Sequence, residues 1–367
     1  MIKFIALSGF LGAGKTTTLI ATARMLEAQG RRVSVVTNDQ GTDLVDTKMA
    51  RSSLDSVAEV TGGCFCCRFD DLMTVVNDLL TSGTADTVIA EAVGSCTDLQ
   101  ATVVRPLRKY HGERFSVAPL ATIVDPHRLR AFARAADRGE PESDLSYLFG
   151  RQLAEADVIA INKTDTISAA DLDALTSALQ EKYPSATVIP YSALTGAGLE
   201  DLVGAWQQEA GWSGDLDIDY DRYAAAEAQL AWYNQRFDLR AASGAGFSPA
   251  AWASAALGKL IEIIGDPASI GHAKIMVDSE HGVTKLSATG GDDGPSADMT
   301  VETPVREAAA FVNARVACDP PVMDQAVLDA VAHADAVAGA TSSGAAGAVS
   351  FKPGYPRPIH HLAASQM

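Results

Sequence analysis

A glycine-rich loop near the N-terminus constrains the fold of this chain more than any other feature. An apolar run from residue 3 predicts a strand, residues 15–29 predict a helix, and the loop between them has the spacing Gly-x4-Gly-Lys-Thr. In this pattern the backbone N–H groups surround a phosphate, the lysine reaches its outer oxygens and the threonine hydroxyl binds Mg²⁺. The positive end of the helix favours the same anion. The residues predicted to bind the phosphates are Gly9, Gly12, Ala13, Gly14, Lys15, Thr16 and Thr17, with Thr16 also the predicted Mg²⁺ ligand.

Charge narrows the range of partners. The 367 residues carry 29 basic and 46 acidic side chains, which gives a net charge of −17. Nonspecific binding to nucleic acids and to anionic membranes depends on an excess of Lys and Arg, so we expect neither as a partner. No signal peptide or apolar run of about 18 residues is visible, which predicts a cytoplasmic protein.

Polar residues follow two of the later apolar runs. Strand-like and helix-like segments alternate up to Trp206, which predicts a doubly wound, mostly parallel α/β sheet. Ligands bind such sheets at the carboxyl ends of the strands. Asp39 follows the run 32–37 and Glu91 follows the run 87–90, so both are candidates to hold Mg²⁺ or to orient an attacking water. The sequence therefore predicts Lys15, Asp39 and Glu91 as catalytic residues.

Three of the five cysteines lie within four positions, at Cys64, Cys66 and Cys67. Two preceding glycines let these thiols converge on a soft or borderline cation such as Zn²⁺, although the spacing does not choose between zinc and cobalt. Three sulfurs leave a tetrahedral ion one open position, which suits metal transfer better than a closed structural site. Three buried cysteines and a redox pair are the alternatives. Cys96 is a candidate fourth sulfur.

The run 162–165 reads Asn-Lys-Thr-Asp and follows a predicted strand over 157–161. A carboxylate at Asp165 accepts hydrogen bonds from N1–H and the 2-amino group of guanine, whereas adenine lacks this pair of donors. A predicted strand over 187–191 and the run 192–196 follow. Because these segments follow the phosphate loop in this order, the sequence predicts that the bound nucleotide is GTP. The residues predicted to contact the nucleoside are Asn162, Lys163, Asp165, Ser192 and Ala193.

The chain divides by composition into four parts. We expect a P-loop GTPase domain over 1–210, an acidic linker over 211–223, a smaller α+β domain over 224–338 and a flexible tail over 339–367. In the second domain the pattern predicts strands over 232–239, 270–277 and 283–288, the last two as a hairpin, and helices over 249–264 and 324–336. Residues 306–317 are ambiguous. The tail ends in a Pro-rich segment with His360 and His361.

The chain resembles the CobW-type family of metal-chaperone GTPases over about residues 3–205. Four motifs carry this resemblance, at residues 9–16, 63–67, 91–94 and 162–165. The family's wider group has a glutamate where most P-loop GTPases have an aspartate, and Glu91 fits this mark. The resemblance implies that the three clustered cysteines carry the transferred metal and that Asp39 and Glu91 lie beside Mg²⁺. It also implies that GTP hydrolysis drives metal release to a client enzyme. The chain departs from the family after Glu91, where it reads Ala-Val-Gly-Ser-Cys.

These features together predict a Mg²⁺-dependent GTPase with slow intrinsic turnover that delivers zinc or cobalt to a client protein. No arginine finger is identifiable in the sequence. Three alternatives stay open: a GTP-dependent switch with a structural zinc, a cofactor-assembly factor such as one serving a corrinoid enzyme, and a small-molecule kinase. A homodimer is a further expectation.

Overall fold

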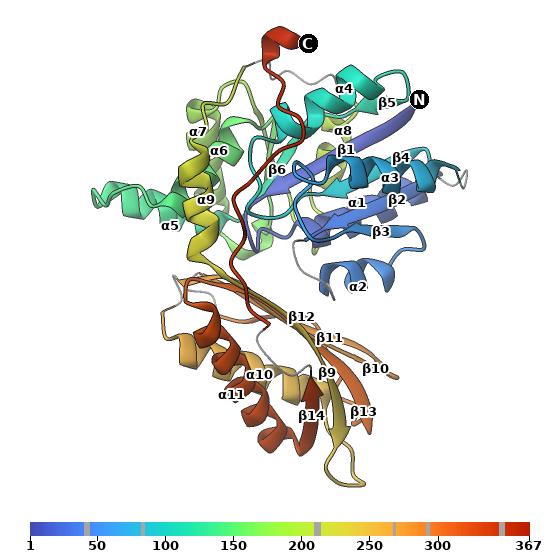
Figure 1. The fold of residues 1–367 in the computed structure, drawn as a ribbon, viewed down its shortest axis with the longest axis vertical. Coiled ribbons are helices and arrows are strands. Elements are labelled where there is room, and N and C mark those ends of the chain that lie inside the picture. Colours follow the sequence, from blue (N-terminus) through green and yellow to red (C-terminus); the bar gives the residue numbers. More distant parts are fainter. Residues whose placement is uncertain (40–44, 82–84, 209–213, 267–268, 291–293, 345–348) are drawn as a thin grey trace. The chain divides into compact units, whose positions relative to one another are not determined.

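The computed structural model describes the chain apart from residues 40–44, 82–84, 209–213, 267–268, 291–293 and 345–348, and apart from the side chains of 136 and 137. It forms two compact units (Figure 1). The first comprises Met1–Gln40, Asp46–Ala226 and Tyr355–Met367, and the second comprises Gly41–Val45 and Glu227–Gly354. Among the described residues, no helix is both long and apolar enough to cross a membrane.

The first unit is built on a parallel sheet with the strand order β3-β2-β4-β1-β6-β7-β8, and β5 also pairs with β1. Every pairing in it is parallel, which confirms the predicted fold class. β2 and β4 are buried along their whole length, as expected for strands covered on both faces. The strands are β1 (Ile2–Gly9), β2 (Val33–Asn38), β3 (Val57–Val60), β4 (Thr87–Glu91), β5 (Phe115–Val117), β6 (Ala121–Val124), β7 (Val158–Ile161) and β8 (Thr187–Pro190).

Helices connect these strands, and serine caps fix where two of them begin. The Ser143 and Ser168 hydroxyls accept hydrogen bonds from backbone N–H groups of the first turns of α6 and α7. A π-helix, η1 (Gln100–Val104), directly precedes α4. The α-helices are α1 (Lys15–Ala28), α2 (Val45–Arg51), α3 (Phe69–Thr81), α4 (Arg105–His111), α5 (Pro126–Asp137), α6 (Asp144–Ala154), α7 (Ala169–Lys182), α8 (Leu199–Ala205) and α9 (Tyr220–Gln229).

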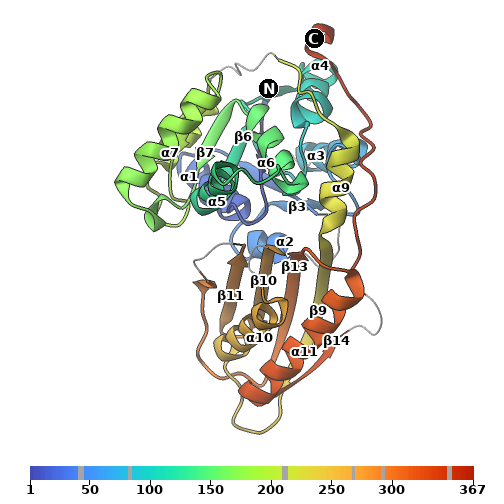
Figure 2. The same cartoon turned by 90° about the vertical axis from the view of Figure 1, so that its left-hand side faces the viewer.

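The second unit is a six-stranded antiparallel sheet with the order β12-β11-β10-β13-β9-β14, which confirms the predicted α+β class. Helices α10 and α11 pack together beside it (Figure 2), with Trp252 and Met323 fully buried in the core. The predicted hairpin is confirmed, and the ambiguous run 306–317 is a central strand. The elements are β9 (Ala231–Ala241), α10 (Pro249–Ile264), β10 (Ile270–Ser279), β11 (Gly282–Thr289), β12 (Ser296–Met299), β13 (Glu307–Val316), α11 (Pro320–Ala338) and β14 (Ala340–Gly344).

The C-terminal residues differ from the flexible tail that composition predicted. Residues 340–344 form β14, an edge strand, because antiparallel pairing with β9 gives this small-residue segment backbone partners on one side. Residues 355–367 pack on the first unit through hydrogen bonds described below. The predicted linker begins among residues outside the described part, and its later residues lead into α9.

Candidate nucleotide and metal sites

The phosphate loop connects β1 to α1 in a backbone conformation that requires glycine. Gly12 and Gly14 have φ values of 76° and 90°, in the left-handed region. A Cβ on Gly14 would lie 2.3 Å from the Asn162 side-chain nitrogen, and one on Gly9 would lie 2.2 Å from the Ile123 carbonyl oxygen. The loop therefore has the conformation and the close backbone approach that a phosphate cradle needs.

The side chains of Lys15 and Thr16 form hydrogen bonds with the loop backbone and with β4, respectively. The Lys15 ammonium donates hydrogen bonds to the carbonyls of Gly9 (2.8 Å) and Phe10 (3.2 Å), so it lies over the loop itself. The Thr16 hydroxyl donates to the Glu91 carboxylate at 3.0 Å. Gly94, just after β4, approaches so closely that a Cβ there would lie 3.0 Å from the Lys15 nitrogen. The phosphate loop and the end of β4 thus form one site.

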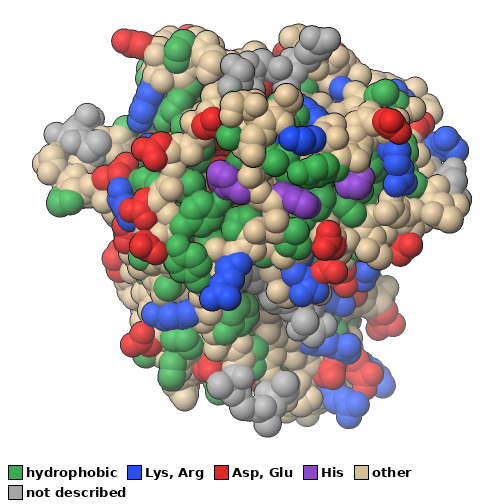
Figure 3. All heavy atoms as spheres, turned by 45° about the horizontal axis from the view of Figure 1, so that its top comes forward, with side chains coloured by type: hydrophobic (Ala, Val, Ile, Leu, Met, Phe, Trp, Pro, Cys, Tyr) green, Lys and Arg blue, Asp and Glu red, His purple; other side chains and the backbone are tan. Residues whose placement is uncertain are grey.

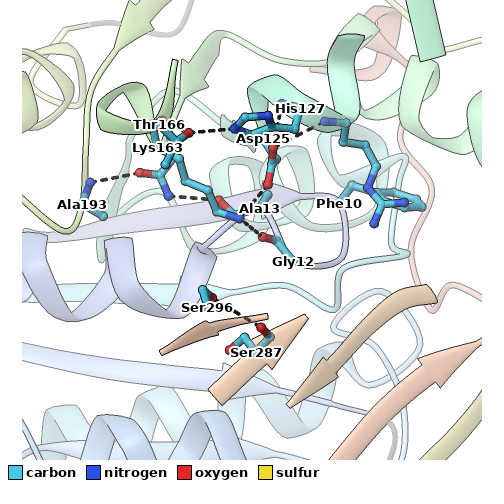
Figure 4. A network of polar contacts seen from close by, with 12 residues as sticks. Phe10, Gly12, Ala13, Asp125, His127, Lys163, Thr166, Ala193, Ser287 and Ser296 are labelled. Atoms are coloured by element: carbon cyan, nitrogen blue, oxygen red, sulfur yellow. Dashed lines mark hydrogen bonds and ion pairs between the residues drawn. The ribbon is translucent and has the colours of Figure 1, made fainter. Parts of the chain in front are cut away.

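Two of the predicted nucleoside-binding residues, Asn162 and Lys163, contact the phosphate loop, and Figure 4 shows Lys163 beside Gly12. The Asn162 side chain donates to the Ala13 carbonyl (3.0 Å) and accepts from the Ala193 N–H (2.9 Å). The Lys163 ammonium donates to the Gly12 carbonyl (3.0 Å) and to the Asp125 carboxylate (2.6 Å). These contacts hold the segments after β7 and β8 against the phosphate loop.

Asp165 is exposed in a short 3₁₀-helix, η2 (Thr164–Thr166), so its carboxylate is accessible to a base. Ser192 is buried and its hydroxyl accepts a hydrogen bond from the Thr195 N–H. One partner here, Asp125, was not predicted from the sequence. Burial raises the pKa of Asp125, but the charge and hydrogen bond of Lys163 outweigh this and hold the pKa below its usual value. The only available signal was an acidic residue directly after a strand.

Two more predicted residues lie near the carboxyl ends of the strands. Thr17 is half-buried in the first turn of α1. Asp39 is buried directly after β2, and its N–H donates to the Val60 carbonyl at 3.3 Å. Two acidic residues that follow Asp39, Asp43 and Asp46, are further candidate metal ligands in the sequence. Asp43 lies outside the described residues, and Asp46 lies in the first turn of α2.

Asn38, at the end of β2, connects this strand to the cysteine loop. Its side-chain nitrogen donates to the carbonyls of Val60 (3.0 Å) and Gly63 (2.8 Å), and its oxygen accepts from the Phe65 N–H (3.0 Å). Sequence analysis assigned no role to this residue, because partners so far along the chain leave no local pattern. The amide fixes the backbone around the first cysteine.

The sulfurs of Cys64, Cys66 and Cys67 all lie within 4.8 Å of one another. The Cys64 and Cys66 sulfurs are 2.7 Å apart, and those of Cys66 and Cys67 are 3.9 Å apart. Zn–S bonds of about 2.3 Å place tetrahedral thiolates about 3.8 Å apart. The Cys66–Cys67 pair has this spacing, and the Cys64 and Cys66 sulfurs would have to move apart by about 1 Å to share one zinc ion. The structure thus brings together the three predicted metal ligands.

The thiols of the cluster differ in pKa. Hydrogen bonds from Cys66, Cys67 and Cys96 lower the pKa of Cys64 well below its usual value. The hydrogen bond with Cys64, together with burial, raises the pKa of Cys67 to about 11. A metal ion binds thiolates, so we expect Cys64 to be the first sulfur to bind it.

The C-terminal segment 355–367 lies across this cluster. The Arg357 N–H donates to the Cys67 sulfur at 3.1 Å, and the Ile359 N–H donates to the Cys66 carbonyl at 2.9 Å. The His360 ring packs edge-on against Phe69, with 4.9 Å between ring centroids. Figure 3 shows histidine side chains gathered among hydrophobic ones on one face. Residues that are distant in sequence therefore cover the cysteine loop.

The position of segment 355–367 over the cysteine loop leads to a testable prediction. Deleting residues 355–367 removes the two hydrogen bonds to the cysteine loop, so the Cys66 and Cys67 thiols of metal-free protein should react with a maleimide about tenfold faster. Ile359→Pro, which removes only the donor to Cys66, should give a smaller increase. Cys318, in the second unit, is the internal control and should keep its rate. Equal rates for the cluster in all three proteins would show that the segment does not protect it.

The fold and the phosphate loop define a P-loop nucleotide-binding protein. The family model for the CobW/HypB/UreG nucleotide-binding domain matches residues 3–190. This match covers half of the chain, and the chain belongs to the CobW/HypB/UreG family.

Characterised relatives align with only part of the chain. It is 30% identical over 224 residues to a protein of Pseudomonas aeruginosa named zinc chaperone CobW, covering 54% of this chain and 58% of that one. It is 29% identical over 194 residues to the zinc chaperone CobW of a Sinorhizobium species, covering 47% and 54%. A solved HypB structure from Helicobacter pylori in complex with nickel shares 19% identity at a TM-score of 0.40, covering 59% and 92%. The chain thus spans little more than half the length of these two zinc-chaperone relatives.

Proposed function

We propose that this protein is a GTP-hydrolysing metal chaperone that binds zinc, or secondarily cobalt, at Cys64, Cys66 and Cys67 and delivers it to a client protein. The proposal rests above all on one observation. The two sites lie at the ends of neighbouring strands: Glu91 at the end of β4 contacts Thr16 of the phosphate loop, and Asn38 at the end of β2, which pairs with β4, holds the cysteine loop through Gly63 and Phe65. The names of the zinc-chaperone relatives support the choice of metal.

In the proposed hydrolysis, the loop N–H groups and the Lys15 ammonium stabilise the negative charge that develops on the phosphate oxygens. A phosphate is a stronger acceptor than the two carbonyls that Lys15 now contacts, so the ammonium can turn to it within the same loop. Glu91, buried at the end of β4, or Asp39 orients the attacking water. Asp165 reads the guanine base.

Oxygen donors for a magnesium ion are present at the same place. The Thr16 hydroxyl and the Glu91 carboxylate lie 3.0 Å apart, with Asp39 as a further acidic candidate, and Mg²⁺ prefers such hard oxygen ligands. Bound Mg²⁺ would neutralise charge on the β- and γ-phosphates.

Zinc affinity measured in two nucleotide states tests the proposal. Chelator competition on the wild type should give affinities that differ by about 5–150-fold between Mg·GDP and a Mg·GTP analogue, the usual range for coupled sites. Cys66→Ser should weaken zinc binding and abolish the difference. Cys318→Ser, outside the cluster, should behave as the wild type.

A zinc affinity that is high and equal in the GDP-bound and GTP-bound protein would contradict the chaperone proposal. It would favour a GTP-dependent switch with a structural zinc, whose partner would be a protein that reads the nucleotide state. A client that gains metal-dependent activity only when GTP is hydrolysed would support delivery. We also propose that the chain can act as a homodimer, which light scattering in both nucleotide states would test.

A further inference from the structure

The C-terminal segment is held on the first unit by hydrogen bonds to its backbone. The N–H groups of Ile359 and Leu362 donate to the carbonyls of Cys66 and Ala101, each at 2.9 Å. The Leu362 carbonyl accepts from the Arg105 guanidinium at 2.7 Å. Because such hydrogen bonds depend on the backbone and not on the side chains of the segment, a surface of this kind can bind extended peptides of different sequence.

The groups that bind the segment come from several elements of the first unit. Arg105 is the first residue of α4, and its side chain is only 4% exposed. Its guanidinium also binds the Asp215 carboxylate at 2.7 Å, and this carboxylate accepts the Ala364 N–H at 2.7 Å. Ala101 belongs to the π-helix η1. We call the residues that bind the segment the docking surface: Cys66, Asp98, Ala101, Arg105 and Asp215.

The His361 imidazole adds a side-chain contact to this backbone recognition. Its Nε2 lies 2.9 Å from the Asp98 carboxylate, which also accepts the Tyr220 hydroxyl at 2.7 Å. Asp98 is 1% exposed, and its φ of 63° lies in the left-handed region that few residues other than glycine adopt. A buried carboxylate that loses a partner is costly, so the docking surface favours a peptide with a histidine at the place of His361.

The segment lies where a metal acceptor must approach. Cys64 and Cys66 are buried, and the Arg357 N–H donates to the Cys67 sulfur at 3.1 Å. A ligand of the acceptor has to come within about 2.0–2.3 Å of a zinc ion bound at these sulfurs. Segments outside helices and sheets open at low free energy, and residues 355–363 belong to no helix or strand. Release of this segment therefore exposes the cluster without disturbing the sheet.

We propose that the docking surface is a peptide-binding site, occupied between transfers by residues 355–367 and during transfer by an extended, histidine-bearing segment of the client protein. The client segment takes over the hydrogen bonds of the displaced one and brings its metal ligands to the cysteine cluster. Zn²⁺ then passes from the thiolates to the client by ligand exchange, with no redox step. This inference rests on the proposed chaperone function and deepens it, because it names the surface and the kind of peptide by which the client is recognised.

A labelled synthetic peptide with the sequence of residues 355–367 is the probe. Full-length Ile359→Pro/His361→Ala has a loosened segment of its own, so the peptide should bind it in a fluorescence anisotropy assay. Bound peptide should also return the maleimide reaction of Cys66 and Cys67 to the slow wild-type rate. The same peptide with His361→Ala should bind about 10–10²-fold more weakly, because one hydrogen bond to a charged group is lost.

Zinc transfer to a chelator tests the role of the surface in metal release. The loosened variant should transfer zinc about tenfold faster than the wild type, because the hydrogen bonds that hold the cover are lost, and added peptide should slow the transfer again. His281→Ala is the matched control, since it changes an exposed histidine in the turn between β10 and β11. It should bind no peptide and should keep the wild-type rates.

The outcomes separate the two proposals. If the loosened variant does not bind the peptide, or if bound peptide changes neither the thiol reaction nor zinc transfer, the peptide-site proposal is overturned and the chaperone proposal stands. Peptide binding is measured without metal or nucleotide, so its result does not depend on whether zinc affinity responds to GTP. Thiol protection in the wild type that falls on dilution would show that a second copy supplies the segment, and would overturn the client assignment. If the double variant fails to fold, His361→Ala alone, which changes a half-exposed side chain, repeats the test.

Discussion

Replacing Lys15 by Ala should reduce the rate of GTP hydrolysis by about 10²–10³-fold, the usual cost of removing one group that stabilises transition-state charge. Lys15 is the buried ammonium of the phosphate loop and contacts the carbonyls of Gly9 and Phe10. The variant loses a positive charge at the site where the γ-phosphate becomes more negative. A single-turnover assay with saturating Mg·GTP measures this step apart from nucleotide binding.

Lys182→Ala is the matched control for this experiment. Lys182 is an exposed lysine at the end of α7, and its ammonium lies over the Tyr183 ring. Its loss should leave the hydrolysis rate unchanged. If Lys15→Ala hydrolysed GTP at the wild-type rate, the phosphate-loop assignment would be wrong. The metal site needs no lysine, so zinc affinity in the presence of GDP should stay close to that of the wild type.

The features that sequence predicted best are those whose chemistry is local. The phosphate loop needs residues only at fixed spacing, so its position before α1 could be predicted from Gly12, Gly14 and Lys15. The clustered cysteines likewise needed only adjacent residues to converge. The strands β2 and β4 are buried on both faces and are continuous apolar runs, which identifies them in the sequence.

Long-range contacts left no such pattern. Asn38, Asp125 and Gln152 bind groups far along the chain, and each was an ordinary polar residue in the sequence. The C-terminal segment was predicted to be flexible from its composition, yet its backbone donors reach the cysteine loop. Such contacts depend on the tertiary fold, which brings distant segments of the chain together. Composition and residue spacing do not specify these long-range contacts.

Several local misses have a physical reason. β3 is only partly buried along its length, so it shows no continuous apolar run. α11 begins at Pro320, earlier than predicted, because two prolines fit the first turn of a helix, where no N–H partner is needed. α9 starts within the predicted acidic linker, with its burial supplied by tertiary packing against Leu148. Short or amphipathic elements of this kind are determined by their neighbours more than by their own sequence.

Asp165→Asn should change the nucleotide preference of the protein. The carboxylate is exposed on η2, beside Lys163, whose ammonium is fixed on the phosphate loop by Gly12 and Asp125. The asparagine oxygen can still accept from N1–H, but its NH₂ group cannot accept from the 2-amino group, so one hydrogen bond to a charged group, about 1.5–3 kcal/mol, is lost and GTP binding should weaken by about 10–10²-fold. Xanthine has a carbonyl where guanine has its 2-amino group, and an asparagine can donate to that carbonyl while accepting from N1–H.

We therefore expect Asp165→Asn to bind xanthosine triphosphate more tightly than GTP, reversing the wild-type order. Competition with a fluorescent nucleotide, run with GTP, ATP and xanthosine triphosphate, measures all three affinities in one assay. Asp173→Asn on α7, which changes an exposed carboxylate away from the phosphate loop, is the control and should keep the wild-type preference. A variant that still prefers GTP would show that Asp165 does not read the base, and would return the small-molecule kinase to consideration. Because the cysteine cluster is untouched, a reversed preference would also give a tool: xanthosine triphosphate could then drive the variant's metal cycle in a mixture where GTP acts on every other GTPase.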